Sequence, residues 1–269
     1  MTDMTDCLPA PLRHAVHQTV AAQRLEGWKP SEENVSALVA LAGGGLAFAE
    51  YLATFRAHHP PPVRHRRQAM FRRKTPYLIP GTALLRNNFG AESAQVLSEL
   101  ECVATAGRMV QWFRESADRA APSDVRDVHR HLFGDVYPWA GEYRTTELRR
   151  GEHAFAWQST IAEGMSRLSD SVRELAEAGV AYDNARLSYE LARVYADYNQ
   201  IHPFREGNGR AGALLLHDIA ARCGRRLDLT SIRRDDWYAA ARDSMPLRRD
   251  GRATHRPFLF LLLHAVVAH

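Results

Sequence analysis

Two apolar helical patterns on either side of a short polar loop constrain the fold of this chain more than any other feature. Over 184–200 the apolar residues recur at steps of four and three, which predicts a helix with one buried face: Leu187, Leu191, Val194, Tyr198 and Ile201. A second apolar pattern over 211–222 predicts another buried helix. The loop at 202–210 is therefore held between two core helices, a rigid place for chemistry.

The ends of both helices are marked in the sequence. Asp183 is placed to cap the first helix, and Pro203 ends it because proline disfavours helical geometry in the residue before it. Gly224 is placed to stop the second helix.

The N-terminal residues 11–58 are also expected to be helical. A break and new helix start are expected at 29–33, and three glycines at 43–45 interrupt the next helix. A region this small builds little core alone, so it should pack on something larger. Residues 59–74 combine three prolines with a run of basic residues and are expected to be an exposed linker.

From residue 75 onward the chain is expected to be mostly helical, with one extended stretch. Residues 142–157 lack a helical period and carry Gly151 near their centre, which favours a short β-hairpin. The expected fold class is all-α with this hairpin, divided into a small helical module at 1–58, the linker at 59–74 and a main domain at 75–269.

Composition and charge exclude several classes of protein. The 269 residues carry a net charge of +4, which is weak support for nucleic-acid binding. The three cysteines are far apart and form no metal-ligand pattern, which fits a reducing cytoplasm. The N-terminus lacks a signal-peptide pattern, and the apolar run 258–268 is about half of the ~20 residues that span a membrane. That run is expected to be a buried terminal helix, and the protein is expected to be cytoplasmic, with no membrane contact.

The loop His-Pro-Phe-Arg-Glu-Gly-Asn-Gly-Arg at 202–210 carries groups suited to phosphate. Gly207 and Gly209 let the backbone approach a ligand closely, at a helix N-terminus that favours anions. Arg210 adds a fork-shaped donor for phosphate oxygens, and Asn208 adds a neutral donor.

The remaining loop residues supply a metal ligand, a base and an anchor. The Glu206 carboxylate suits Mg²⁺ that bridges phosphates, and His202 is a base with an ordinary pKa of roughly 6.5. Phe204 is expected to point into the core and anchor the loop. Together these groups predict nucleotidyl or phosphoryl transfer; the plainer alternative is a Gly-Asn-Gly turn before a helix.

The loop resembles the signature of Fic-domain proteins, HxFx(D/E)GNGRxxR, and matches its first nine positions. The stretches at 78–90, 128–145 and 149–157 are similar to the corresponding parts of bacterial Fic toxins, so the resemblance covers the chain from about residue 75 onward.

The resemblance implies a helical enzyme that transfers AMP from Mg-ATP to a Ser, Thr or Tyr hydroxyl of a target protein. His202 would deprotonate the hydroxyl, Glu206 would hold Mg²⁺, and Phe204, Gly207, Asn208, Gly209 and Arg210 would form the nucleotide site. The hairpin at 147–157 resembles the Fic flap, so Arg149, Gly151 and Phe155 would dock the target by strand addition. Some Fic toxins modify DNA gyrase and topoisomerase IV subunits, which makes these the first target candidates.

The segment 22–27 resembles the inhibitory motif [ST]xxxE[GN] of Fic antitoxins. By this resemblance Glu26 would enter the ATP site and repel the γ-phosphate, and residues 1–58 would be an antitoxin-like module fused to its toxin. The alternative is that Glu26 and Gly27 form an ordinary helix end.

Two positions depart from these motifs. Ala22 stands where the inhibitory motif has a hydroxyl, and Ala213 stands where the Fic signature has its last arginine, which in the family holds the γ-phosphate and pairs with the inhibitory glutamate. The loss of a charged hydrogen bond of this kind is worth roughly 1.5–3 kcal/mol.

Several interpretations of Ala213 stay open. Arg205 or another basic residue substitutes, the donor is another nucleotide or phosphate-containing group, or the protein is a weakly active Fic fold that binds or regulates. Glu26 would then pair with Arg210 or be held loosely.

Overall fold

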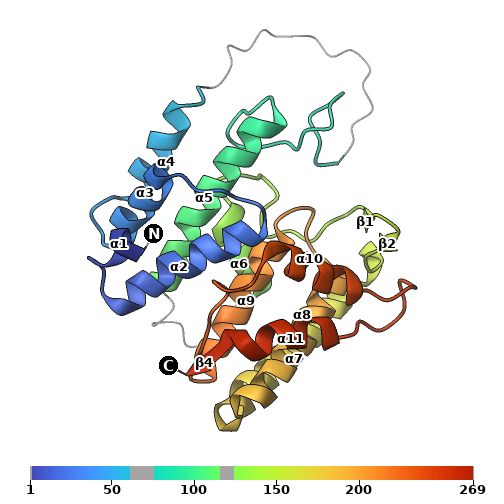
Figure 1. The fold of residues 1–269 in the computed structure, drawn as a ribbon. Helices are drawn as coiled ribbons and strands as arrows, with labels where there is room; N and C mark the ends of the chain where they lie inside the picture. Colours follow the sequence, from blue (N-terminus) through green and yellow to red (C-terminus); the bar gives the residue numbers. More distant parts are fainter. Residues whose placement is uncertain (1, 61–75, 116–123, 269) are drawn as a thin grey trace.

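The computed structural model describes residues 2–60, 76–115 and 124–268, and it is mostly helical (Figure 1). The N-terminal half begins with four helices and continues with two more that precede the hairpin: α1 (Thr2–Thr5), α2 (Ala10–Leu25), α3 (Glu32–Ala42), α4 (Phe48–Ala57), α5 (Ala94–Glu115) and α6 (Val125–Phe133). The predicted linker at 59–74 lies outside the described residues from residue 61 onward.

The second half begins with an antiparallel hairpin of β1 (Arg149–Arg150) and β2 (His153–Ala154). The remaining elements are helices, short 3₁₀ turns and a second small antiparallel sheet: η2 (Gln158–Thr160), α7 (Ile161–Ala178), η3 (Gly179–Ala181), α8 (Asn184–Ile201), α9 (Asn208–Arg222), β3 (Arg225–Leu227), α10 (Arg234–Asp243), α11 (Arg256–Ala265) and β4 (Val266–Ala268). The expected fold class, mostly helical with a short hairpin, is confirmed.

Each half is built around one long helix, α5 in the first and α8 in the second. Helices α2, α3, α4 and α6 pack on α5, while α7, α9 and α11 pack on α8. Helix α9 also contacts α6 and α2, so the N-terminal helices lie directly beside the motif-bearing helix (Figure 1).

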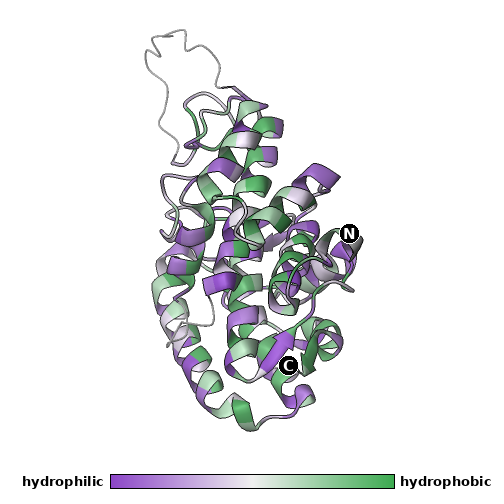
Figure 2. Cartoon of the chain, turned by 90° about the vertical axis from the view of Figure 1, so that its left-hand side faces the viewer, coloured by the Kyte–Doolittle hydropathy of each residue, from purple (hydrophilic) through white to green (hydrophobic). Residues whose placement is uncertain are grey.

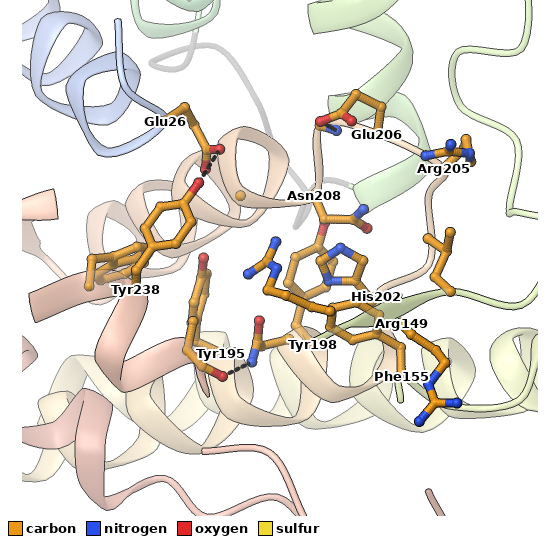
Figure 3. A pocket seen from close by; sticks show the side chains of 17 residues that line it. Glu26, Arg149, Phe155, Tyr195, Tyr198, His202, Arg205, Glu206, Asn208 and Tyr238 are labelled. Atoms are coloured by element: carbon orange, nitrogen blue, oxygen red, sulfur yellow. Dashed lines mark hydrogen bonds between the residues drawn. The ribbon is translucent and has the colours of Figure 1, made fainter. Parts of the chain in front are cut away.

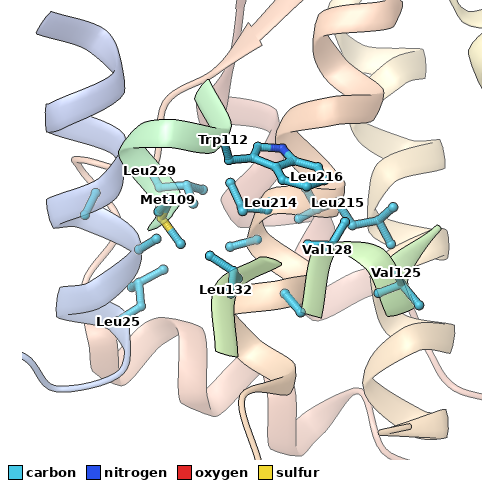
Figure 4. Packing of buried hydrophobic residues seen from close by; sticks show 14 of the residues in the cluster. Leu25, Met109, Trp112, Val125, Val128, Leu132, Leu214, Leu215, Leu216 and Leu229 are labelled. Atoms are coloured by element: carbon cyan, nitrogen blue, oxygen red, sulfur yellow. The ribbon is translucent and has the colours of Figure 1, made fainter. Parts of the chain in front are cut away.

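One hydrophobic cluster runs through these helices. Leu25 of α2, Met109 of α5, Leu132 of α6 and Leu214 of α9 all belong to it and lie close together (Figure 4). Apolar and polar residues alternate along the helices in Figure 2, as expected of helices with one buried face. The expectation that 11–58 needs a larger partner for its core therefore agrees with the packing.

The ends of the first motif helix were predicted correctly. The Asp183 carboxylate accepts a hydrogen bond from the Arg186 backbone N–H at 2.7 Å, and α8 ends at Ile201. After α9, Gly224 adopts φ +67°, the left-handed geometry that glycine permits beyond a helix end.

The start of the second helix was predicted three residues too late. Helix α9 begins at Asn208, because Gly207 adopts φ +81° and turns the chain directly into the helix. A Cβ atom on Gly207 would overlap the Phe133 ring, so glycine is needed here for space as well as for backbone geometry. Three residues of the predicted loop thus form the first turn of α9.

Side chains of α2 fix its position against the larger part of the chain. Gln18 donates to the Asp228 carboxylate at 2.9 Å and accepts from the Leu229 backbone at 2.8 Å. Gln23 donates to the Thr105 hydroxyl on α5 at 2.8 Å. These contacts hold the helix although Ala22, which is buried, offers no hydroxyl.

The prediction of a buried terminal helix over 258–268 was partly wrong. Helix α11 ends at Ala265, and Val266–Ala268 pair with β3. Phe260 is 72% exposed and Leu263 is 42% exposed, since only one face of this short helix packs on α8. No helix in the described part of the chain is long and apolar enough to span a membrane.

Candidate functional site

A cavity of about 200 Å³ lies at the N-terminus of α9, between the hairpin, α8 and α10 (Figure 3). Many of the predicted site residues line it: Glu26, Arg149, Phe155, His202, Glu206, Gly207, Asn208 and Gly209. Phe204, Arg210 and Gly151 do not line it. The cavity is smaller than the ~300 Å³ at the lower end of small-molecule sites, and one of its walls is the Glu26 side chain.

His202 lies at one end of the cavity in an unusual backbone conformation. It ends α8 with φ +48° and ψ +63°, the left-handed region that non-glycine residues seldom adopt. Its N–H donates to the Tyr198 carbonyl at 2.9 Å, and its carbonyl accepts from Arg144 at 2.8 Å. These contacts stabilise a backbone conformation that costs of order 1 kcal/mol. Residues in such strained conformations cluster at functional sites.

The imidazole of His202 is covered by the flap. The Phe155 ring stacks on it with centroids 3.7 Å apart and planes 11° from parallel. Burial, together with the positive charges of Arg150 and Arg144, lowers the pKa of His202 well below its ordinary value. The ring is therefore neutral at physiological pH, the form required of a proton acceptor, and its buried Nδ1 has no hydrogen-bond partner among the described residues.

Glu206 lies across the cavity from Tyr238 (Figure 3). Its Oε1 accepts the Gly207 backbone N–H at 3.0 Å and lies 3.9 Å from Arg210 Nη2. Burial and the nearby Glu101 carboxylate raise the pKa of Glu206. No group of three or more His, Cys, Asp or Glu residues that could hold a metal occurs among the described residues. Any ion here would thus need ligands from a substrate as well.

Asn208 and His129 brace the loop from inside. The Asn208 side chain accepts from the Phe204 N–H at 2.9 Å and donates to the Phe204 carbonyl at 2.8 Å. The buried Phe204 ring stacks on His129 with centroids 3.9 Å apart. His129 Nδ1 accepts the Gly141 N–H, so Nε2 is the donor to the Glu206 carbonyl at 2.9 Å. In this state Asn208 and Phe204 support the loop backbone.

Arg210 points into the interior, away from the cavity. It forms a buried ion pair with Glu101 of α5, and its Nη1 donates to Thr105 at 3.3 Å. Glu101 also accepts the Tyr137 hydroxyl. Burial disfavours the charged form of Arg210, but the carboxylates of Glu101 and Glu26 outweigh that effect and raise its pKa. The sequence left open that Glu26 pairs with Arg210 or is held loosely. In the structure Arg210 pairs with Glu101 and not with Glu26.

Glu26 instead contacts the first turn of α9. A Cβ atom on Gly209 would overlap Glu26 Oε1, so the absence of a side chain there lets the carboxylate reach the helix N-terminus. Glu26 Oε2 accepts the Tyr238 hydroxyl of α10 at 3.3 Å (Figure 3). The residue after it, Gly27, has φ +95°, which turns the chain away from the cavity.

Arg144 is the main structural residue that sequence reasoning missed. Only 2% exposed, it donates to the backbone carbonyls of both the flap and the motif loop: Thr146 at 2.8 Å, Ala156 at 2.6 Å, Ile201 at 3.2 Å and His202 at 2.8 Å. A single guanidinium therefore fixes Phe155 and His202 relative to each other. The only sequence signal for Arg144 was its position in the stretch 128–145, which is similar to bacterial Fic toxins. That similarity did not indicate what its side chain contacts.

Arg144→Ala is expected to lower the free energy of unfolding by about 3 kcal/mol, because buried carbonyls lose their charged donor. Urea denaturation of the full chain measures this change. Arg173→Ala, which removes an exposed arginine paired with Asp170, is the control and should stay within about 0.5 kcal/mol. A loss below about 1 kcal/mol for Arg144→Ala would contradict the role assigned to it.

Comparison with known proteins identifies the family. The Fic/DOC family model matches residues 119–220. A Salmonella typhimurium protein named "Probable protein adenylyltransferase Fic" is 30% identical over 168 residues, 62% of this chain and 82% of the relative. The chain belongs to the Fic/DOC family. An Escherichia coli protein of the same name is 29% identical over 169 residues, 62% of this chain and 82% of the relative.

Solved structures of other Fic domains share the fold. The N-terminal Fic domain of a VirB-translocated effector from Bartonella quintana, solved with bound ADP, has a TM-score of 0.60 and 20% identity. The match covers 72% of this chain and 95% of that one. The predicted resemblance to Fic-domain proteins is thus confirmed for family and fold.

Proposed function

We propose that this Fic-family chain is a protein adenylyltransferase, which transfers AMP from ATP to a hydroxyl of a target protein. The observation that carries the proposal is one cavity lined by a neutral histidine, a carboxylate and the glycine-rich start of a helix. The relatives named protein adenylyltransferase support the same activity.

In the proposed reaction His202 accepts the proton of a Ser, Thr or Tyr hydroxyl. The hydroxyl oxygen forms a bond to the α-phosphorus of ATP, the bond between the α-phosphorus and its bridging oxygen breaks, and pyrophosphate leaves. Gly207, Asn208 and Gly209 line the cavity at the N-terminus of α9, which favours the negative charge that accumulates on the phosphates. Arg210 would reach the phosphates only after leaving Glu101.

Glu206 is the proposed magnesium ligand. Mg²⁺ in nucleotide sites is held by one or two carboxylates together with substrate phosphates, and Glu206, the cavity carboxylate of the motif loop, fits that pattern. When bound, Mg²⁺ neutralises charge on the phosphates of ATP. Glu206 would hold the ion, and its contact with the Gly207 N–H fixes one carboxylate oxygen.

We propose that Glu26 inhibits this activity. Its carboxylate occupies the helix N-terminus that phosphates would use, and like charges repel there. In this proposal residues 1–58 form an antitoxin-like module, 59–74 a linker and 75–269 the Fic domain of a toxin-antitoxin pair within one chain.

The flap is the proposed docking site for the target. Arg149 lines the cavity, Phe155 covers His202, and Gly151 at φ +59° forms the hairpin turn. A target segment added along the flap as a strand would bring its hydroxyl toward His202. Subunits of DNA gyrase and topoisomerase IV are the first targets to test.

The position of a radioactive label on ATP tests the proposal. The full chain carrying Glu26→Gly is incubated with Mg²⁺ and bacterial lysate, once with α-labelled and once with γ-labelled ATP. Adenylyl transfer labels a protein from the α-phosphate alone. Label from the γ-phosphate would show phosphoryl transfer instead, and mass spectrometry would identify another phosphate-containing group. No label from any of the four nucleoside triphosphates would refute transferase activity.

A further inference from the structure

The end of the cavity opposite His202 is already occupied by an anion, the carboxylate of Glu26. Figure 3 shows Glu26 and Tyr238 on one side of the cavity and His202 with Phe155 on the other. The carboxylate lies against Gly209 in the first turn of α9 and accepts the Tyr238 hydroxyl at 3.3 Å. A group of this charge and size marks a site built to receive an anion.

The side chain of Arg150 lies beside this site, over two aromatic rings. The Arg150 guanidinium is 5.5 Å from the centre of the Tyr238 ring and 5.7 Å from the centre of the Phe155 ring. It lines the cavity, and in the part of the chain that the structure describes it has neither a hydrogen bond nor an ion pair. With burial, its positive charge lowers the pKa of His202. Burial and Glu26 raise the pKa of Tyr238, and Arg150 opposes that rise, so its field reaches both ends of the cavity.

The other arginines of the cavity are less suited to this anion site. Arg149 donates to the Glu152 carbonyl within the hairpin turn at 3.3 Å. Arg205 lies on the Glu206 side, across the cavity from Tyr238 (Figure 3). Helix α9 itself supplies no cation here, since Arg210 pairs with Glu101 and residue 213 is a buried alanine.

The order of phosphates in the cavity follows from the proposed chemistry. The attacked phosphate must lie next to His202, so the phosphates beyond it extend past Gly209 toward Glu26. We infer that Arg150 and Tyr238 bind the terminal phosphate of the nucleoside triphosphate once Glu26 has left the site. This inference rests on the proposed adenylyltransferase function and makes these two residues the determinants of triphosphate over diphosphate binding.

Tyr238 and Arg150 suit a terminal phosphate for separate reasons. The phenol donates one hydrogen bond at a fixed position, because α10 holds its ring and Arg234 stacks against it at 4.5 Å. The guanidinium offers several donors in a plane and is pre-positioned between two aromatic rings. A diphosphate that starts at the same place by His202 is too short to use either group fully.

Calorimetry on full-length chains that carry Glu26→Gly tests the inference. Mg-ATP and Mg-ADP are titrated into this parent and into versions with Arg150→Gln or Tyr238→Phe added. Each added change is expected to weaken ATP binding about tenfold, the loss of one hydrogen bond to a charged group, and to leave ADP binding within about twofold. Arg233→Gln removes an exposed arginine paired with Asp236, and this control should change neither affinity.

The outcomes separate this inference from the proposed function. If Arg150→Gln and Tyr238→Phe weaken ATP and ADP equally, or weaken neither, the terminal-phosphate site is elsewhere and the inference is wrong, while transferase activity can still stand. If the parent with Glu26→Gly has an unchanged Tm but binds neither nucleotide, the proposed function fails and the inference fails with it.

Discussion

Replacing His202 with asparagine is expected to lower kcat/KM for adenylylation of the target by at least about 100-fold. General-base catalysis by a positioned side chain contributes typically about 10²–10⁴-fold. Asparagine cannot accept the proton at neutral pH, but it tolerates the left-handed backbone that this position requires at φ +48°. The loss should therefore appear in turnover, with ATP affinity within about twofold of the parent.

The same measurement has a control and a pH signature. His264→Ala removes an exposed histidine of α11 whose Nδ1 hydrogen-bonds the Phe260 carbonyl of the same helix, and activity should be unchanged. Because the pKa of His202 is lowered, the base stays unprotonated as the pH falls through 6.5. The acid limb of the kcat/KM profile should therefore lie below pH 6.5, and a midpoint above that value would contradict the assigned base.

Glu26→Gly is expected to raise the rate of target labelling about 10- to 100-fold at ATP concentrations below saturation. Typical coupling free energies between sites, about 1–3 kcal/mol, give this range. The physical reason is the loss of a carboxylate from the N-terminus of α9, where it contacts Gly209. The measurement is the initial rate of transfer from α-labelled ATP, with the dissociation constant of ATP determined alongside.

Two further variants separate charge from shape. Glu26→Gln keeps the side chain's size and removes its charge, so it should show most of the increase if electrostatic exclusion is the cause. Glu32→Gln, on the first turn of α3, alters an exposed carboxylate outside the cavity and should have no effect. An unchanged rate for both Glu26 variants would exclude Glu26 as an inhibitor.

The sequence predicted those parts of the fold that depend on local signals. The apolar stripe of α8, the Asp183 cap and the glycine break between α3 and α4 were all correctly placed, because short-range hydrogen bonds and periodicity determine them. The start of α9 was misplaced because the backbone angle of Gly207 decides it, and the Phe133 ring, more than seventy residues away, requires a glycine there.

Long-range partners in the site could not be predicted in the same way. The chemistry of the motif loop suggested phosphate contacts for Arg210, but a carboxylate on α5 pairs with it in this structure. Nothing near Arg210 in the sequence indicates Glu101, because tertiary packing alone brings the two together. The same holds for Tyr238, which lies 212 residues after Glu26 and contacts its carboxylate.

The position of Glu26 at the end of α2, a helix of the shared core, has a consequence for how the proposed inhibition responds to protein concentration. Helix α2 buries Val16 and Val20 completely and is part of the same polypeptide as the loop it contacts. Under the proposed inhibition the ratio of inhibitor to enzyme is thus fixed at one, and neither dilution nor uneven expression can change it. An activating signal would have to act on the contact itself, by moving a side chain or loosening the last turn of α2, since no separate subunit has to dissociate.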